Sequence, residues 1–401
     1  MAEKAASPQA APGPVSVEQR KKAEPEELLP EIASYNKHLP DVEEKLIQVW
    51  KSFQAIGKPS IAKMDDFLNQ LMALPPESVN WGEVMHVFGR AKYPELIGPF
   101  RRIAEAVPHV EATDMRYFYW AAVKEFIGAD DARFLPEVAS GCRRLDVDTY
   151  DIDVLDQIMD LLLVSGFDLE VLELAEHFLP IVREDDGLIG GADGDWADFI
   201  YELRVGKAIR FGEKNPLPEA VSADLVRDIE DDIAPEMVHE AAAAICEAKA
   251  NWKPERAAFQ LVDGCISEDP QAWRDCLRLC GALIKVAREA WEFERHSPGS
   301  AYRSLCLTLA SVYRWKWDRA KKGKKCGENL LDFLHLSGLE RRVIMSSRDF
   351  IGVKTGRALL LLEGHGLLLR FAVRHNLIAP GDAGSLEREI QKLKKDLKPS
   401  A

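Results

Sequence analysis

Residues 273–291 read WRDCLRLCGALIKVAREAW, and the spacing of their apolar side chains decides the fold class. These side chains fall alternately four and three positions apart, which places them on one face of a long helix. They are Trp273, Leu277, Cys280, Ile284, Ala287 and Trp291. The same helical period recurs along most of the chain, and convincing alternation of apolar and polar residues is absent. The sequence therefore predicts an all-α protein.

Two stretches near the C-terminus need separate treatment. Residues 358–373 read ALLLLEGHGLLLRFAV, a stretch that charged residues interrupt and that is shorter than the roughly 20 residues of a spanning helix. It is expected to form a buried helix pair or one core helix of a soluble protein. Residues 341–355 are instead compatible with a short hairpin, whose apolar residues are Val343, Ile344, Phe350, Ile351 and Val353.

A faint repeat organises the first half of the chain. Pro94-Glu95 and Pro136-Glu137 lie 42 residues apart, each pair is followed by two arginines, and a degraded copy at Pro180 comes 44 residues later. A two-helix unit at this period resembles the repeats of HEAT- or armadillo-like α-solenoids, in which each hairpin buries its apolar face against its neighbours. The resemblance covers roughly residues 80–185. The alternative is three unrelated helix starts, each with a proline in its first turn.

The charge of the chain is divided by position. Residues 1–270 hold 27 Lys and Arg against 52 Asp and Glu, a net charge of −25. Residues 271–401 hold 25 against 14, a net charge of +11. Such asymmetry predicts contact with another charged molecule, or docking of the two parts on each other.

Composition predicts three parts. Residues 1–27 nearly lack aliphatic side chains and have no apolar core of a secretory signal, so we expect a disordered leader over residues 1–30. Segments rich in Gly and Pro then separate an acidic solenoid-like domain over 31–212 from a helical domain with a basic surface over 219–401. Seven cysteines without an export signal indicate reduced thiols and a cytoplasmic location.

The densest cationic segment is residues 314–325, RWKWDRAKKGKK, which carries seven basic side chains and two tryptophans in twelve residues. Basic side chains neutralise phosphates and indole rings stack on unpaired bases, so the segment predicts a site for nucleic acid or another anion. The candidate residues are Arg314, Trp315, Lys316, Trp317, Arg319, Lys321, Lys322, Lys324 and Lys325. Further cations are expected to extend this surface: Arg341, Arg342, Arg348, Lys354, Arg357, Arg370 and Arg374.

Two other interpretations of this segment stay open. It is equally compatible with a solvated helix end, with both tryptophans in the core and the lysines beside the helix C-terminus. It is also compatible with a contact to the acidic half of the same chain or of another subunit.

The acidic segment 184–195, EDDGLIGGADGD, is expected to be a loop. It lacks the ordered spacing and final Glu of a calcium-binding loop. A flexible turn is one interpretation, and a docking strip for a basic partner is the other. The candidate partner-binding residues are Asp185, Asp186, Asp193 and Asp195.

Metal and catalytic signatures are weak. Glu83 and His86, like Glu236 and His239, lie one helical turn apart, as do the ligand pairs of di-iron bundles. A chain this rich in Glu produces such pairs by chance, so helix-surface pairs are the better interpretation. Cys276 and Cys280 lack a CxxC partner motif and are expected to be apolar core thiols. Hydrolase, phosphate-loop and dinucleotide motifs are absent from the sequence.

These observations predict a non-catalytic interaction or scaffold protein. It would bind a protein partner through an acidic helical-repeat surface and a basic C-terminal region, with no metal, cofactor or membrane attachment. A nucleic-acid-binding or nucleic-acid-processing α-solenoid is the first alternative. A metal-dependent helical enzyme is the second.

Overall fold

The structure, a computed structural model, contains sixteen α-helices in its described residues, and no β-strand occurs among them. The all-α prediction is therefore confirmed. The described residues are 32–33, 40–55, 60–106, 112–145, 152–184, 192–211, 217–247, 252–262, 269–324, 327–335, 339–347 and 354–397.

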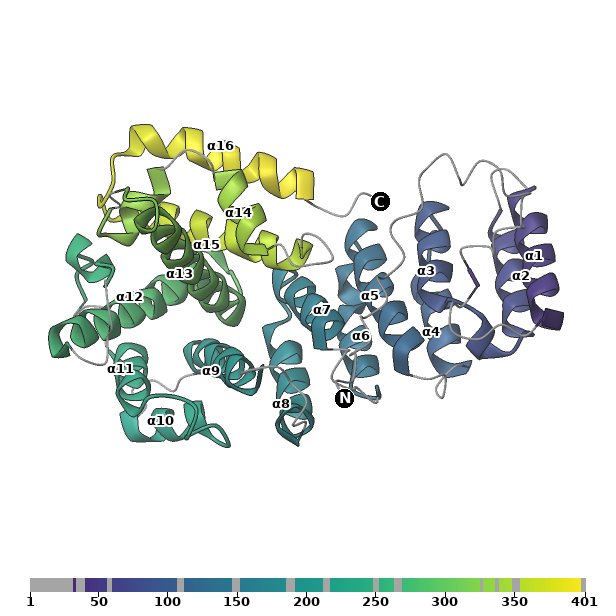
Figure 1. Ribbon diagram of the computed structural model, residues 1–401, viewed down its shortest axis with the longest axis horizontal. Coiled ribbons are helices and arrows are strands. Elements are labelled where there is room, and N and C mark those ends of the chain that lie inside the picture. Colours follow the sequence, from purple (N-terminus) through teal and green to yellow (C-terminus); the bar gives the residue numbers. More distant parts are fainter. Residues whose placement is uncertain are drawn as a thin grey trace, which may run out of the picture.

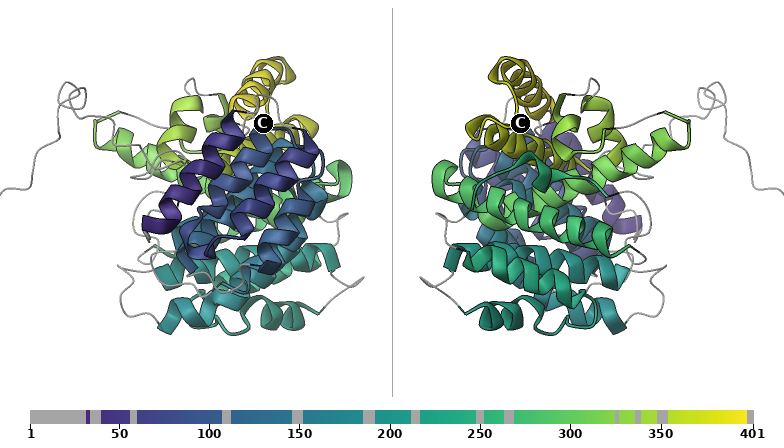
Figure 2. Two further views of the ribbon diagram at one scale, coloured as in Figure 1. Left: turned by 90° about the vertical axis from the view of Figure 1, so that its right-hand side faces the viewer. Right: turned by 90° about the vertical axis from the view of Figure 1, so that its left-hand side faces the viewer.

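The first eight helices follow one another along the long axis of the molecule (Figure 1). Helices α3, α5 and α7 contact each other in turn, and α6 contacts α8 beside them. The end-on view of Figure 2 shows these helices stacked one behind another. Their bounds are α1 Pro40–Gln54, α2 Ile61–Met72, α3 Trp81–Arg90, α4 Ile97–Ala106, α5 Ala112–Gly128, α6 Leu135–Cys142, α7 Ile152–Val164 and α8 Asp168–Glu184.

The remaining helices gather around α13 and α15. These two pack on each other and α13 also packs on α9, and both contact the first part, because α15 lies against α7 and α13 against α8. The buried apolar side chains form one connected core across both parts. A boundary at residues 212–219 stays a prediction. The bounds are α9 Ala192–Phe211, α10 Pro218–Val226, α11 Pro235–Cys246, α12 Pro270–Glu294, α13 Pro298–Ala320, α14 Leu339–Ser347, α15 Thr355–Arg374 and α16 Pro380–Leu397.

Glycines bring the central helices unusually close together. A Cβ atom at Gly206 of α9 would lie 2.2 Å from the Cα of Gly299 on α13. A Cβ at Gly364 of α15 would lie 2.2 Å from the carbonyl oxygen of Ser304 on α13. Because no real Cβ approaches so closely, these two helix contacts depend on the absence of a side chain.

Two sequence predictions in the C-terminal part have different outcomes. Residues 358–373 lie within the single helix α15, most of whose side chains are buried, as expected. The hairpin at residues 341–355 is wrong over 341–347, which belong to α14. Leu339 and Val343 are both buried and lie one turn apart, so they dock a helix face on the core. Phe350, Ile351 and Val353 lie outside the described residues.

The repeat prolines occupy different positions. Pro136 is in the first turn of α6, as the repeat predicts, and Pro94 lies in the turn before α4. Pro180, by contrast, lies inside α8, where its exposed ring faces solvent. The third copy therefore does not begin a helix. Within the described residues, no helix is both long and apolar enough to cross a membrane.

Candidate interaction surface

One face of the C-terminal half of α13 packs into the protein. The ring of Trp315 meets that of Phe333 edge-on, with the centroids 5.3 Å apart. The guanidinium of Arg319 lies over the Trp315 ring, 4.7 Å from its centroid, and Lys316 is buried. Trp315, Lys316 and Arg319 therefore contribute to packing in this structure, three of the nine residues expected at an anion site.

The opposite face of α13 is exposed. Arg314, Trp317 and Lys321 are three and then four positions apart, so they line one stripe, and the Trp317 side chain is 60% exposed. The Nζ atom of Lys321 lies 3.2 Å from the centroid of the Trp317 ring. Lys322 and Lys324 follow and are also exposed. We call Arg314, Trp317, Lys321, Lys322 and Lys324 the basic tip. Lys325 lies outside the described residues.

The end of α13 fixes the course of the chain through the basic tip. Gly323 has a φ of +64°, a conformation that favours glycine. The N–H of Gly323 donates to the carbonyl of Ala320, and the N–H of Lys324 donates to the carbonyl of Arg319. This pair of bonds is a Schellman motif, which satisfies carbonyls at the helix end. Cations at this end also interact favourably with the helix dipole.

The basic surface does not extend as far as the sequence suggested. Arg342 is buried, and its Nη1 donates to the carbonyl oxygen of Phe333 at 3.0 Å. Arg370 and Arg374 both pair with glutamates of α12. Arg341 is exposed on α14, whereas Arg348 lies outside the described residues.

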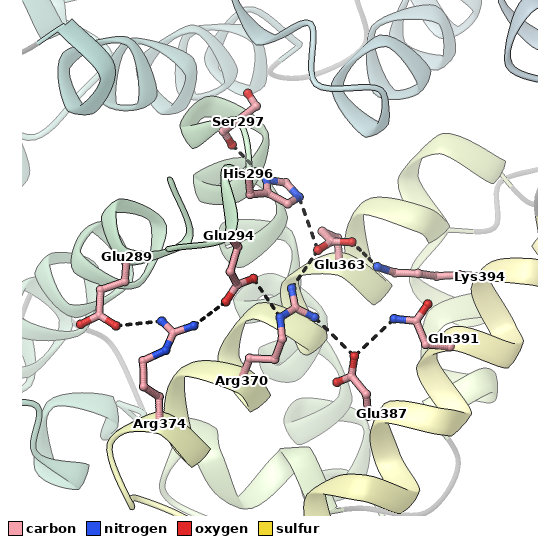
Figure 3. Close-up of polar contacts among 10 residues, drawn as sticks. All are labelled: Glu289, Glu294, His296, Ser297, Glu363, Arg370, Arg374, Glu387, Gln391 and Lys394. Atoms are coloured by element: carbon pink, nitrogen blue, oxygen red, sulfur yellow. Dashed lines mark hydrogen bonds and ion pairs between the residues drawn. The ribbon is translucent and has the colours of Figure 1, made fainter. Parts of the chain in front are cut away.

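Figure 3 shows the ion-pair network that engages Arg370 and Arg374. Arg374 lies between Glu289 and Glu294 of α12, at 3.1 and 2.8 Å. Arg370 contacts Glu294 at 2.9 Å, Glu363 at 3.2 Å and Glu387 of α16 at 3.5 Å. The alternating charges hold α12, α15 and α16 together.

Glu363 is the central acid of this network. Its side chain also pairs with Lys394 of α16 and lies 3.4 Å from Nε2 of His296. Although burial opposes its ionisation, the hydrogen bond from His296 and the charge of Lys394 hold the pKa of Glu363 well below its usual range. Burial lowers the pKa of His296, but Glu363 outweighs it and raises that pKa. The contacts with His296 and Lys394 therefore favour the charged form of Glu363.

A second charged cluster lies in the core between α7, α9 and α13. Arg303 pairs with Glu202 at 2.7 Å. Burial and the neighbouring Asp160 together raise the pKa of Asp156 to about 6. The sequence pattern did not indicate this cluster, because acids between apolar residues suggest the solvated face of a helix. The signal that could have revealed it is the near absence of basic residues around Asp156 and Asp160.

The acidic segment after α8 is only partly described. Asp185 and Asp186 lie outside the described residues. Asp193 and Asp195 belong to the first turn of α9, so the loop is shorter than the sequence suggested. A partner-binding role for these four residues stays a prediction.

The histidines expected in carboxylate pairs have other partners or are exposed. Nδ1 of His86 lies 2.6 Å from Oε1 of Glu125 on α5, whereas Glu83 pairs with Arg90 on its own helix. His239 is exposed. In the described part of the chain, no three His, Cys, Asp or Glu side chains converge in a way that would hold a metal ion.

The two cysteines of α12 are not equivalent. A hydrogen bond from the Cys280 thiol lowers the pKa of Cys276 to about 7, against the effect of partial burial. The same interaction, with burial, raises the pKa of Cys280. Both side chains are half-buried, so neither is as fully enclosed in the core as the sequence suggested.

The basic tip thus combines several exposed cations with an exposed aromatic ring. Comparison of the chain with protein-family models, with curated proteins and with solved structures finds no match in any of the three.

Proposed function

We propose that this protein is a non-catalytic binding protein, in which a HEAT- or armadillo-like helical array carries the basic tip as a docking surface for an acidic segment of a protein partner. The exposed Trp317 ring beneath the Lys321 ammonium carries the proposal. Such a pair offers an apolar platform and a cation within one helical turn. An acidic peptide would place carboxylates against the lysines and an apolar side chain against the indole.

Ion pairs support the repeat interpretation of the first part. In each copy of the faint repeat, an arginine pairs with an acid from a later helix or turn. The pair between Arg101 and Glu137 measures 2.5 Å and is bidentate. The full series is Arg101–Glu137, Arg143–Glu173 and Arg183–Asp232. Arg101 and Arg143 each follow the proline of their copy by seven residues, whereas Arg183 follows Pro180 by three. The first two pairs are therefore the equivalent ones, and contacts repeated between successive units are typical of stacked repeats.

The size of the basic tip favours an acidic protein segment. Its four cations span only residues 314–324, and Arg342, Arg370 and Arg374 already have partners in the same chain. An extended nucleic acid would need a longer row of cations to neutralise successive phosphates. A short acidic segment needs no more than the basic tip provides.

The test is binding of a labelled Glu-rich peptide containing one leucine, beside the same peptide with Gln for Glu. Wild type is expected to bind only the acidic peptide, with affinity that falls as salt rises. W317A is expected to weaken binding roughly tenfold or more, and K321Q/K322Q/K324Q to abolish its salt dependence. A matched control removes three other exposed lysines, Lys63, Lys392 and Lys395. Equal binding by this control and the tip variant would contradict the proposal.

Single-stranded nucleic acid is the second candidate, favoured by the exposure of the Trp317 ring among cations. Indole rings stack on bases whatever their sequence. However, Lys321 already occupies one face of this ring, so a base on that face would have to displace it. Tighter binding of a labelled oligonucleotide than of the acidic peptide, lost in W317A, would favour this second function.

A further inference from the structure

We infer that one acidic partner of the basic tip is a second copy of this chain, which docks through the acidic edge formed by α10, α11 and the turn between them. This inference rests on the proposed function of the basic tip. The acidic edge comprises the exposed residues Leu217, Glu219, Asp224, Asp228, Glu230, Asp231 and Glu236.

Charge complementarity is the first argument. Residues 217–247 contain nine Asp and Glu and only one basic residue, Arg227, a net charge of −8. Residues 314–325 contain seven basic residues and one acid, a net charge of +6. Two such surfaces attract at close range, whereas the net charge of −14 on each chain acts over distances that salt screens. The screening length is about 8 Å at physiological ionic strength.

The two surfaces also match in their apolar residues. Leu217, at the start of α10, is 71% exposed and lies two residues before Glu219. Trp317 is 60% exposed in the middle of the basic tip. Each surface therefore combines one large exposed apolar side chain with charges that are, with one exception, of the same sign. A contact that buries both apolar groups among opposite charges is stabilised by the removal of apolar surface from water and by the attraction between the charges.

One chain cannot bring its own two surfaces together. The C-terminal half of α13 lies against α14, where the hydroxyls of Ser311 and Ser346 are 2.8 Å apart. Helices α10 and α11 pack on α9 and α12 instead. In Figures 1 and 2, α10 lies at the opposite edge of the molecule from α14 and α16. The pairing is therefore between chains, and it is head-to-tail, because a tip meets an edge rather than another tip.

The test is sedimentation velocity of the full chain over a range of concentrations, at low and high salt. Wild type is expected to self-associate at low salt and to dissociate at high salt. Two variants reverse the charge of one surface each: K321E/K322E/K324E in the basic tip and D224K/E230K/D231K in the acidic edge. Each is expected to weaken self-association at least about tenfold, because it places like charges opposite one another. The variant carrying both reversals is expected to self-associate again, because the two surfaces are complementary once more.

Each outcome decides between the two proposals. All substituted side chains are exposed, and circular dichroism confirms that each variant is folded. Wild type that stays monomeric at low salt while binding the Glu-rich peptide would overturn the inference and leave the proposed function intact. Failure of both assays would remove the proposed function as well. Self-association that survives either single reversal, or that the double reversal does not restore, would place the contact elsewhere and overturn the inference.

Discussion

Oδ2 of Asp168 accepts a 2.8 Å hydrogen bond from the backbone N–H of Gly299, and the Asp168 side chain is 2% exposed. The carboxylate belongs to the first turn of α8, yet it caps the first turn of α13, 131 residues further along the chain. Its other oxygen accepts a 2.6 Å hydrogen bond from Arg210. An anion at a helix N-terminus satisfies unpaired N–H groups and interacts favourably with the helix dipole. This one side chain therefore ties three helices from both parts of the chain.

Removal of the Asp168 carboxylate should be strongly destabilising. D168A leaves the Arg210 guanidinium without its acid and the Gly299 N–H without its acceptor, so we expect the free energy of unfolding to fall by about 3–5 kcal/mol. Urea unfolding followed by circular dichroism measures the change. The matched control is D224A, an exposed acid, whose expected effect is within about 0.5 kcal/mol. Similar effects of the two variants would show that the buried bonds contribute little.

Substitution of Gly364 tests the close contact between α13 and α15. In G364A the new methyl group would meet the Ser304 carbonyl at 2.2 Å, so the helices must separate, at a cost of about 1–3 kcal/mol or more. Gly98 of α4 provides the control, because a Cβ there has no neighbour within 4 Å. G98A is expected to stabilise by up to about 1 kcal/mol through helix propensity. The midpoint temperature of thermal unfolding should therefore fall in G364A and rise in G98A.

The sequence predicts the helices well because helical period is a local property. The α12 stripe is only partly internal, however: Ile284 and Ala287 are buried, whereas Trp273 and Trp291 are half-buried. How deeply each side chain of α12 is buried depends on which other helices pack against it. The sequence of α12 alone does not say which helices these are. The hairpin prediction was wrong for a local reason. It covered residues 341–355 and left out Leu339, which lies four residues before Val343, a spacing that indicates a helix face.

Composition locates the cationic segment, and helical period could also have given the orientation of its two tryptophans. Trp315 and Trp317 are two residues apart and therefore point to nearly opposite sides of a helix. Continuing the buried positions Leu305 and Val312 along α13 would have placed Trp315 inside and Trp317 outside. The ion pairs that engage Arg370 and Arg374 had no such signal. Their partners on α12 lie 76 or more residues away, and only the tertiary structure brings them together.

Asp156 should make stability depend on pH. Its pKa is raised from 3.8 to about 6 in the folded protein, so the folded state binds the proton more tightly than the unfolded state. The stability contributed by the protonated form is complete below pH 4 and is lost as pH rises towards 6. We expect D156N to raise the free energy of unfolding at pH 7.5 by roughly 1–3 kcal/mol, with no gain below pH 4. Urea unfolding of wild type and D156N between pH 4 and pH 7.5 measures this difference in the free energy of unfolding. A D156N variant less stable than wild type at every pH would contradict the argument.

Glu363 should have the opposite pH dependence. Its pKa is lowered in the folded protein, so its contribution is present above the unfolded value of 4.5 and is lost as pH falls. E363Q removes the charge that holds Lys394 and His296, and we expect about 1–3 kcal/mol of destabilisation at neutral pH. Hydrogen exchange of α16 amides should accelerate, because this helix is anchored through Lys394. E387Q, which removes the carboxylate charge from the 3.5 Å ion pair with Arg370, is the control and should accelerate the exchange of α16 amides much less.

Cys276 should be the most reactive described thiol of the native protein. The hydrogen bond from Cys280 stabilises its thiolate and lowers its pKa to about 7, and the thiolate is the nucleophilic form. The rate of alkylation by iodoacetamide, followed by mass spectrometry, should therefore rise with a midpoint near this pH. In C280A the donor is lost, so the midpoint should move up towards the usual value for cysteine. Cys142, which is fully buried with a raised pKa, should stay unlabelled throughout and reports on unfolding. An unchanged midpoint in C280A would show that some other group, such as the helix itself, activates the thiol.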